Sequence, residues 1–154
     1  MRLSVTRHER CEGKKVPWLD RRTIGRLERA ARSAGSPGGG VDLVVVDDAF
    51  IRELNREYRG IDRPTDVLSF SYSDDGSSGA ALAGEIYVSH ETVARDARAA
   101  AVPPEHVFLR VGVHGVLHVI GYDHENTADA RRMEAEEKRI LLEHLAPTEV
   151  EELF

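Results

Sequence analysis

A mostly apolar stretch, residues 107–120, constrains the fold of this chain more than any other feature. Only Arg110, His114 and His118 interrupt it, and it is shorter than the roughly 20 residues that a membrane span needs. A helix that is apolar on nearly every side belongs in a protein core. We therefore expect a buried helix that starts at Pro103-Pro104 and ends at Gly121, with the rest of the chain packed around it.

The remaining pattern predicts a single α/β domain that comprises residues 1–154, a length suited to one hydrophobic core. The run at 41–46 is dense in β-branched residues, which favours a strand in the interior of a sheet, buried on both faces. Residues 72–82 are rich in Ser, Gly and Asp and predict a connector. Alternation and capping signals predict about four strands, at residues 3–7, 41–46, 67–71 and 83–89, and about five helices, at residues 17–34, 48–58, 90–101, 104–121 and 127–145.

Charge and cysteine content narrow the functional classes. The net charge of -6 argues against a protein that coats nucleic acid through bulk electrostatics. Residues 1–32 nevertheless carry ten Lys/Arg and four Asp/Glu, so their helix is either an anion-facing surface or simply a solvated face. Cys11 is the one cysteine, which excludes an internal disulfide. With no secretory signal and no membrane span in the sequence, we expect a cytoplasmic protein without membrane contact.

Three histidines carry the chemistry. His114 and His118 are four residues apart on the predicted core helix, so they project from one face about 6 Å apart along its axis. Gly121 can adopt the positive φ that turns the chain and brings His124 back towards the pair. Three neutral nitrogens leave one position of a tetrahedral zinc open, which is typical of catalytic sites. The sequence therefore predicts one catalytic zinc per chain, held by His114, His118 and His124, although the donor set also suits Ni, Co or Fe.

The same spacing occurs in metzincin proteases, where a glutamate that acts as general base follows the first histidine. Here that residue is Gly115, which offers no proton acceptor. A metalloprotease would need a base from outside the helix and is the weaker alternative. A structural zinc normally has four protein ligands, usually cysteines, and Cys11 is a poor fourth ligand on sequence grounds.

With these residues assembled, the chain resembles the YbeY family of bacterial metal-dependent endoribonucleases over nearly its whole length. The resemblance rests on the histidine motif and on residues 54–59 (LNREYR), 65–70 (TDVLSF) and 84–89 (GEIYVS). It implies an α/β fold with a small mixed sheet and zinc on His114, His118 and His124. It further implies cleavage of single-stranded RNA near the 3′ end of 16S rRNA, and involvement in ribosome quality control.

The resemblance also places a family arginine at Arg59. An arginine that faces the metal can stabilise the negative charge that builds on phosphate oxygens, so Arg59 is the candidate catalytic residue. Asp123 is either an orienting partner of a metal ligand or a turn residue, and His90 is expected on the surface in the first turn of its helix. The expected partners are single-stranded RNA, small-subunit rRNA and small-subunit ribosomal proteins. A non-enzymatic ribosome-assembly module with structural zinc is the other alternative, and the oligomeric state is left open.

Overall fold

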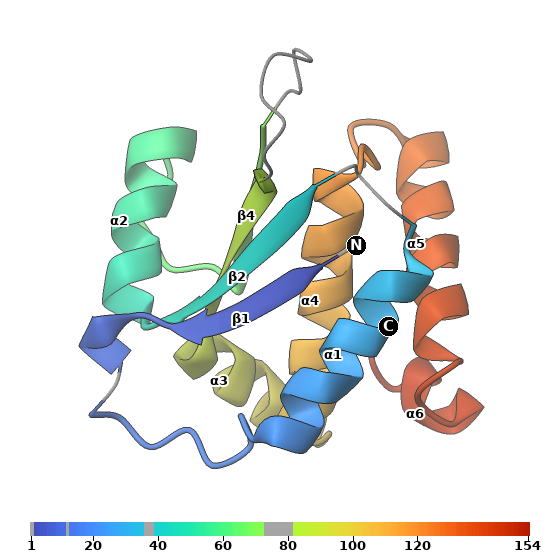
Figure 1. Cartoon of the computed structure of the whole chain (residues 1–154), viewed down its shortest axis with the longest axis horizontal. Helices are drawn as coiled ribbons and strands as arrows, with labels where there is room; N and C mark the ends of the chain where they lie inside the picture. The colour runs from blue at the N-terminus through green and yellow to red at the C-terminus, as the bar shows by residue number, and fades with distance from the viewer. Residues whose placement is uncertain (1, 12, 36–38, 73–81) are drawn as a thin grey trace.

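The computed structural model describes residues 2–11, 13–35, 39–72 and 82–154 and has one four-stranded mixed sheet (Figure 1). The strand order is β1-β2-β4-β3. β1 pairs with β2 and β2 with β4 in parallel, whereas β3 pairs antiparallel to β4 and forms an edge. The strands are β1 (Leu3–Arg7), β2 (Gly40–Val46), β3 (Val67–Ser71) and β4 (Leu82–Ser89).

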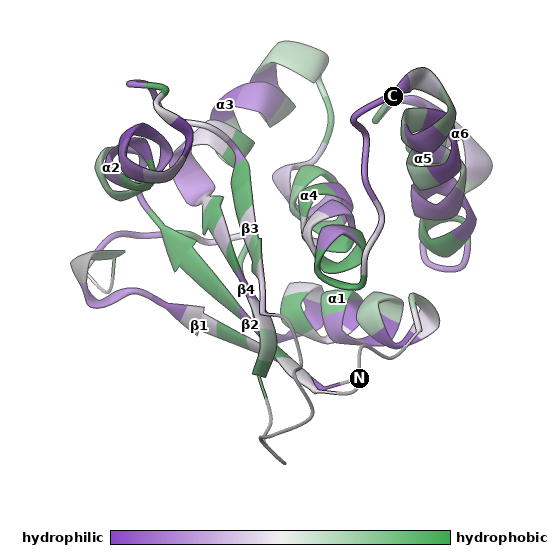
Figure 2. Ribbon diagram, turned by 90° about the horizontal axis from the view of Figure 1, so that it is seen from above, coloured by the Kyte–Doolittle hydropathy of each residue, from purple (hydrophilic) through white to green (hydrophobic). Residues whose placement is uncertain are grey.

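Helices cover both faces of this sheet. α1 and α4 pack on one face and α2 on the other, while α5 lies on the far side of α4 from the sheet (Figure 2). The described residues also include a short 3-10 helix, Glu9–Cys11. The α-helices are α1 (Arg21–Ser33), α2 (Asp48–Arg59), α3 (His90–Ala100), α4 (Pro104–Val119), α5 (Thr127–Leu141) and α6 (Pro147–Glu151).

α4 is the predicted core helix. Eleven of its 16 residues are buried, and it contacts α1, α3 and α5 as well as the sheet. Two of its glycines lie where the packing is closest: a Cβ at Gly112 would meet Leu27 of α1, and one at Gly115 would meet Ile86 of β4. The absent side chains therefore let α4 approach both neighbours, and the helix holds its two histidines in a fixed position against the sheet.

The predicted architecture is confirmed, with corrections at the helix ends. The first helix begins at Arg21 and not at Pro17, because the side chain of Asp20 accepts a hydrogen bond from the Thr23 N–H and caps the helix there. The last predicted helix ends at Leu141, and Pro147 starts a separate short helix, so the described residues hold six α-helices instead of about five.

β2 occupies the predicted interior position of the sheet. Its side chains alternate between buried and half-buried, with Val41, Leu43 and Val45 facing the main core. Val46 belongs to a smaller cluster with Ile51 of α2. Most of the predicted connector, residues 73–81, lies outside the described residues. Within the described part of the chain, every helix is too short or too polar to cross a membrane.

Candidate metal centre

His114 and His118 lie one turn apart on α4, with ring centroids separated by 4.7 Å. Both side chains are half-buried, which follows from their place on the rim of an otherwise buried helix. Burial lowers the pKa of His118, and the neighbouring rings of His114 and His124 lower it further. The neutral imidazole, which is the form that binds a metal, is therefore favoured at His118.

The third histidine reaches the pair through the turn that ends α4. Gly121 has a φ of +113°, and its N–H donates to the His118 carbonyl oxygen at 3.1 Å. The Tyr122 N–H donates to the Leu117 carbonyl oxygen at 2.9 Å, which closes the helix end. The ring of His124 then lies 4.8 Å from that of His118, centroid to centroid. The predicted glycine turn is confirmed.

Asp123 stabilises the next turn. Its Oδ1 accepts hydrogen bonds from the backbone N–H groups of His124 at 2.6 Å and of Glu125 at 3.2 Å. Of the two roles considered for Asp123, the geometry favours the turn residue. By fixing the backbone at His124, Asp123 restricts where the exposed imidazole can go.

The three imidazoles fit a metal ion. One nitrogen from each of His114, His118 and His124 lies within 4.8 Å of the other two. Nitrogens that share a tetrahedral zinc at roughly 2.0 to 2.1 Å lie about 3.4 Å apart, so the three rings would move closer together when they hold an ion. All three donors are neutral nitrogen ligands, which suits zinc and neighbouring transition metals. The described residues thus bring together the whole predicted ligand set.

A fourth residue, Glu137 of α5, belongs to the site and was missed by the sequence reasoning. Its Oε1 lies 2.5 Å from Nδ1 of His114, and its side chain is 4% exposed. The other oxygen, Oε2, lies 3.9 Å from Nε of Arg110. A signal was present, because Glu137 stands four residues after Met133 and four before Leu141 on the inward face of α5. A carboxylate on an apolar helix face indicates a buried partner.

The histidines open into a cavity of about 380 Å³, which we call the metal cleft. Edge strand β3 and the residues that precede it form one wall, and α4 with the loop after it forms the other. The cleft is lined by Arg59, Thr65, Asp66, Val67, Leu68, Ser69, Ser71, His114, His118 and His124.

Arg59 therefore lies where the sequence reasoning expected it, in the same cleft as the histidines. It is the last residue of α2, which ends at Gly60 in the left-handed conformation with φ +69°. The Asn55 side-chain amide donates to the Arg63 carbonyl oxygen at 2.9 Å and holds the following loop against the helix. The cleft thus contains both the metal-binding histidines and the positively charged side chain of Arg59. The catalytic role of Arg59 stays a prediction.

Gly115 faces the sheet, where the packing leaves no room for a side chain. An ideal Cβ at this position would lie 2.7 Å from Cγ2 of Ile86 and 3.1 Å from Oγ of Ser69. A glutamate at residue 115 would therefore clash with β3 and β4. Glycine at residue 115 therefore argues against the metzincin arrangement in two ways: it offers no proton acceptor, and the packing around it excludes a glutamate.

The other histidines take no part in this centre. His90 was expected on the surface, but it is 7% exposed because α3 packs its first turn against β4 and α2, so that expectation was wrong. Nε2 of His106 lies 3.6 Å from Oε2 of Glu149, a pairing that joins α4 to α6. His144 lies beyond α5, and its Nε2 has no hydrogen-bond partner within the described residues.

The comparisons with known proteins agree with this geometry. Residues 21–145 match the family model described as endoribonuclease YbeY. The chain is 41% identical to the endoribonuclease YbeY of Moorella thermoacetica over 129 residues, and this alignment covers 77% of this chain and 83% of that protein. It is 40% identical to the one from Syntrophotalea carbinolica, over 73% of this chain and 78% of that protein. A match of 40% identity to the Rhodopseudomonas palustris relative covers 75% of this chain and 64% of that protein.

A solution structure from Thermotoga maritima has a similar fold. The TM-score is 0.59 at 30% sequence identity, and the match covers 98% of this chain and 88% of that one. The family match includes β2, β3, β4, the core helix and all three histidines of the metal centre, and it begins after β1. On these grounds, the chain belongs to the endoribonuclease YbeY family.

Proposed function

We propose that this chain is a single-strand-specific endoribonuclease that uses one zinc ion held by His114, His118 and His124. Membership in an endoribonuclease family makes it a nuclease that acts on RNA. The observation that carries the finer proposal is the convergence of three neutral nitrogen donors in a cleft that also contains Arg59. A site with three protein ligands leaves a position open for a reacting oxygen, whereas a closed structural site does not.

Each residue of the cleft has a role that follows from its chemistry. A bound zinc would supply Lewis acidity, either to a phosphoryl oxygen or to an attacking water. Arg59 would hold phosphate oxygens through its fork of N–H donors and stabilise the charge that grows on them. Glu137 would keep a proton on Nδ1 of His114, so that Nε2 is the nitrogen that faces the ion. RNA also carries its own 2′-hydroxyl, so the chemistry does not require a base at residue 115.

The family resemblance also suggests a substrate, partners and a location in the cell. We infer that the substrate is the rRNA of the small ribosomal subunit, that the reaction contributes to maturation of the 16S 3′ end, and that the protein takes part in ribosome quality control. Small-subunit ribosomal proteins are then the expected protein partners, and the cytoplasm is the expected location. The basic residues of α1 would offer a contact for RNA phosphates outside the cleft.

The test combines metal analysis with RNA cleavage. The purified, untagged chain should contain one zinc, cleave single-stranded RNA, lose that activity to a chelator and regain it when zinc is restored. Mapping the product ends separates the two routes, because attack by water leaves no cyclic phosphate whereas attack by the 2′-hydroxyl does. His114→Ala should fold but neither bind zinc at the centre nor cleave. Cleavage that resists chelation would remove the metal from the proposal.

The same experiment decides between the alternatives. Undiminished rRNA processing by the folded His114→Ala variant would favour an assembly module whose zinc is structural. Zinc-dependent proteolysis of casein that persists in the presence of competing RNA would favour a metalloprotease, despite the steric exclusion of a glutamate at residue 115.

A further inference from the structure

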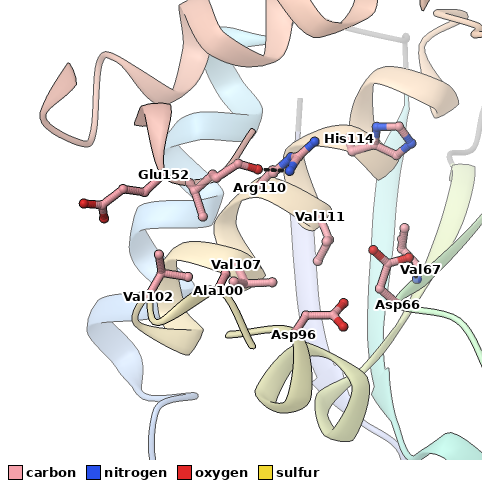
Figure 3. Close-up of a pocket in the computed structure, with 11 residues that line it drawn as sticks. Asp66, Val67, Asp96, Ala100, Val102, Val107, Arg110, Val111, His114 and Glu152 are labelled. Atoms are coloured by element: carbon pink, nitrogen blue, oxygen red, sulfur yellow. Dashed lines mark hydrogen bonds between the residues drawn. The ribbon is translucent and has the colours of Figure 1, made fainter. Parts of the chain in front are cut away.

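A second cavity, of about 270 Å³, adjoins the metal cleft and shares Asp66, Val67 and His114 with it. We call it the Asp96 pocket. It lies between α3, the first half of α4 and the start of β3, with the C-terminal segment closing one side (Figure 3). Its volume is near the lower end of the roughly 300 to 1,000 Å³ typical of small-molecule sites. The size suits a single planar group that enters from the cleft.

One side of the Asp96 pocket is apolar. Val102, Val107 and Val111 contribute this wall, and all three belong to the main hydrophobic core or its edge. Their positions along α4 and the turn before it give a continuous surface beside the cleft (Figure 3). A nucleobase has two apolar faces, so a wall of this kind can cover one of them.

The opposite side carries two carboxylates from different elements. Asp66 precedes β3 and Asp96 lies on α3, and both side chains point into the pocket (Figure 3). Oδ1 of Asp66 accepts a hydrogen bond from the Val67 N–H at 2.8 Å, whereas its Oδ2 has no partner within the described residues. Asp96 has no hydrogen-bond partner there either. Asp96 is exposed at the mouth of the pocket, where partial burial of its carboxyl group and the charge of Asp66 raise its pKa. Each ionised carboxylate can accept a hydrogen bond from a ligand that donates.

The chemistry of the two carboxylates discriminates among bases. An ionised carboxylate only accepts hydrogen bonds. Guanine presents two neighbouring donors on its Watson–Crick edge, N1–H and the N2 amino group. Adenine and cytosine place an acceptor nitrogen beside their amino group, and uracil places its one N–H between two carbonyl oxygens. Guanine is therefore the base whose edge matches this pocket without placing an acceptor against a carboxylate.

We propose that the Asp96 pocket binds the base of a nucleotide next to the scissile phosphate and prefers guanine, through hydrogen bonds from the N2 amino group to Asp96 and from N1–H to Asp66. The inference rests on the proposed endoribonuclease function, because His114 lines both the pocket and the metal cleft and so places the base beside the cleavage site. Single-stranded RNA suits such a pocket, since its bases are free to turn out of the strand.

The experiment uses the zinc-loaded full chain and short single-stranded oligouridines that contain one guanosine. Cleavage should concentrate at one fixed distance from the guanosine. Replacing guanosine with inosine, which lacks the N2 amino group, should slow cleavage at that position by roughly 10-fold to 100-fold, the range expected for losing a hydrogen bond to a charged group. Asp96→Asn should abolish this difference and still cleave oligouridine. Glu57→Gln, an exposed carboxylate of α2 outside the pocket lining, should retain it.

The outcomes separate this inference from the proposed function. Equal cleavage of the guanosine and inosine RNAs, or an unchanged preference in Asp96→Asn, would overturn the base pocket and leave the nuclease proposal intact. Failure to cleave any RNA would defeat the proposed function. In that event, the base pocket is tested by fluorescence anisotropy, which measures binding of the same oligonucleotides to the chain. Tighter binding of the guanosine RNA that is lost in Asp96→Asn supports the pocket. Binding that changes neither with inosine nor with Asp96→Asn overturns it.

Discussion

Oε1 of Glu137 and Nδ1 of His114 lie 2.5 Å apart, on two helices that meet behind the metal centre. The buried carboxylate can only accept when ionised, so the histidine must donate from Nδ1 and present Nε2 to the cleft. Arg110, which contacts the other carboxylate oxygen at 3.9 Å, offsets the negative charge of Glu137. The pair couples the packing of α5 against α4 to the geometry of the metal ligands.

Glu137→Gln should therefore weaken metal binding. Glutamine nearly preserves the shape but removes the charge that fixes the ring, and loss of such an orienting partner typically costs 10-fold to 100-fold in metal affinity. A zinc titration against a competing chelator measures the change. Glu136→Gln is the matched control, because Glu136 is on the same helix and pairs with Arg139 instead. Equal affinities in the two variants would show that Glu137 is only a packing residue.

Arg59→Glu should retain zinc and lose cleavage. The substitution reverses the charge at the proposed phosphate contact, and removing one such transition-state contact typically lowers the rate by about 100-fold to 1,000-fold. Metal content and the rate of cleavage of a single-stranded RNA are measured on the same sample. Arg56→Glu, in the same last turn of α2 but outside the lining of the metal cleft, should cleave normally. Full activity in Arg59→Glu would make it a surface residue.

The metal ligands were predictable from the sequence because their geometry is local. Two histidines four residues apart must share a helix face, and a glycine before the third permits the turn that returns it. The elements were predictable for the same reason, since alternation and capping residues act over a few positions. α1 nevertheless begins after Asp20 and not at Pro17. The Asp20 side chain accepts a hydrogen bond from the Thr23 N–H, one of the backbone N–H groups that have no partner within the helix at its N-terminus, and Pro17 has no side-chain acceptor for such a group.

Contacts between distant segments were not predictable in this way. The pairing of Glu137 with His114 spans 23 residues, and the burial of His90 depends on how α3 docks on the sheet. The position of Arg59 in the metal cleft also depends on tertiary structure, because α2 and α4 pack on opposite faces of the sheet, and residues of both helices line the cleft beside the edge strand β3. From the sequence, only the family resemblance predicted that Arg59 belongs to the site.

Gly115→Ala should destabilise the fold although alanine favours helices. The new Cβ would meet Ile86 at 2.7 Å, and overpacking of this kind typically costs about 1–3 kcal/mol, against a propensity gain of about 1 kcal/mol. Urea unfolding of the metal-free chain measures the balance. Gly25→Ala is the control, because its Cβ would meet only the flexible end of Arg29 at 3.3 Å, so the free energy of unfolding should stay the same or rise. A stabilised Gly115→Ala would contradict the packing argument.

Gly121→Ala should reduce both stability and zinc affinity. A Cβ at φ +113° costs roughly 1–2 kcal/mol, and the chain can relieve it only by shifting the turn that carries His124. Gly35→Ala, at φ +103° after α1, imposes a similar strain far from the metal centre along the chain and should reduce stability alone. Unfolding and zinc titration of both variants separate the effects. Unchanged zinc affinity in Gly121→Ala would mean that the turn does not determine where His124 lies.

His90 should make the fold less stable at mildly acid pH. Burial lowers the pKa of this histidine, and its Nε2 has no hydrogen-bond partner within the described residues. The unfolded chain binds a proton near pH 6.5, whereas the folded chain binds it only at a lower pH. The free energy of unfolding therefore falls as the pH drops below about 6.5, by at most about 1.4 kcal/mol per pH unit from this group, until the folded-state pKa is passed. Above that range the histidine is neutral in both states and contributes no pH dependence.

The measurement is urea unfolding with a chelator present, from pH 7.5 to pH 5, on the natural chain and on His90→Gln. The other histidines titrate equally in both proteins, so the difference between the two pH profiles isolates His90. The natural chain should lose more stability than His90→Gln as the pH falls, because glutamine has no proton to gain. Parallel profiles would mean that the packing of α3 loosens enough to hydrate this histidine, and that its burial does not oppose its protonation.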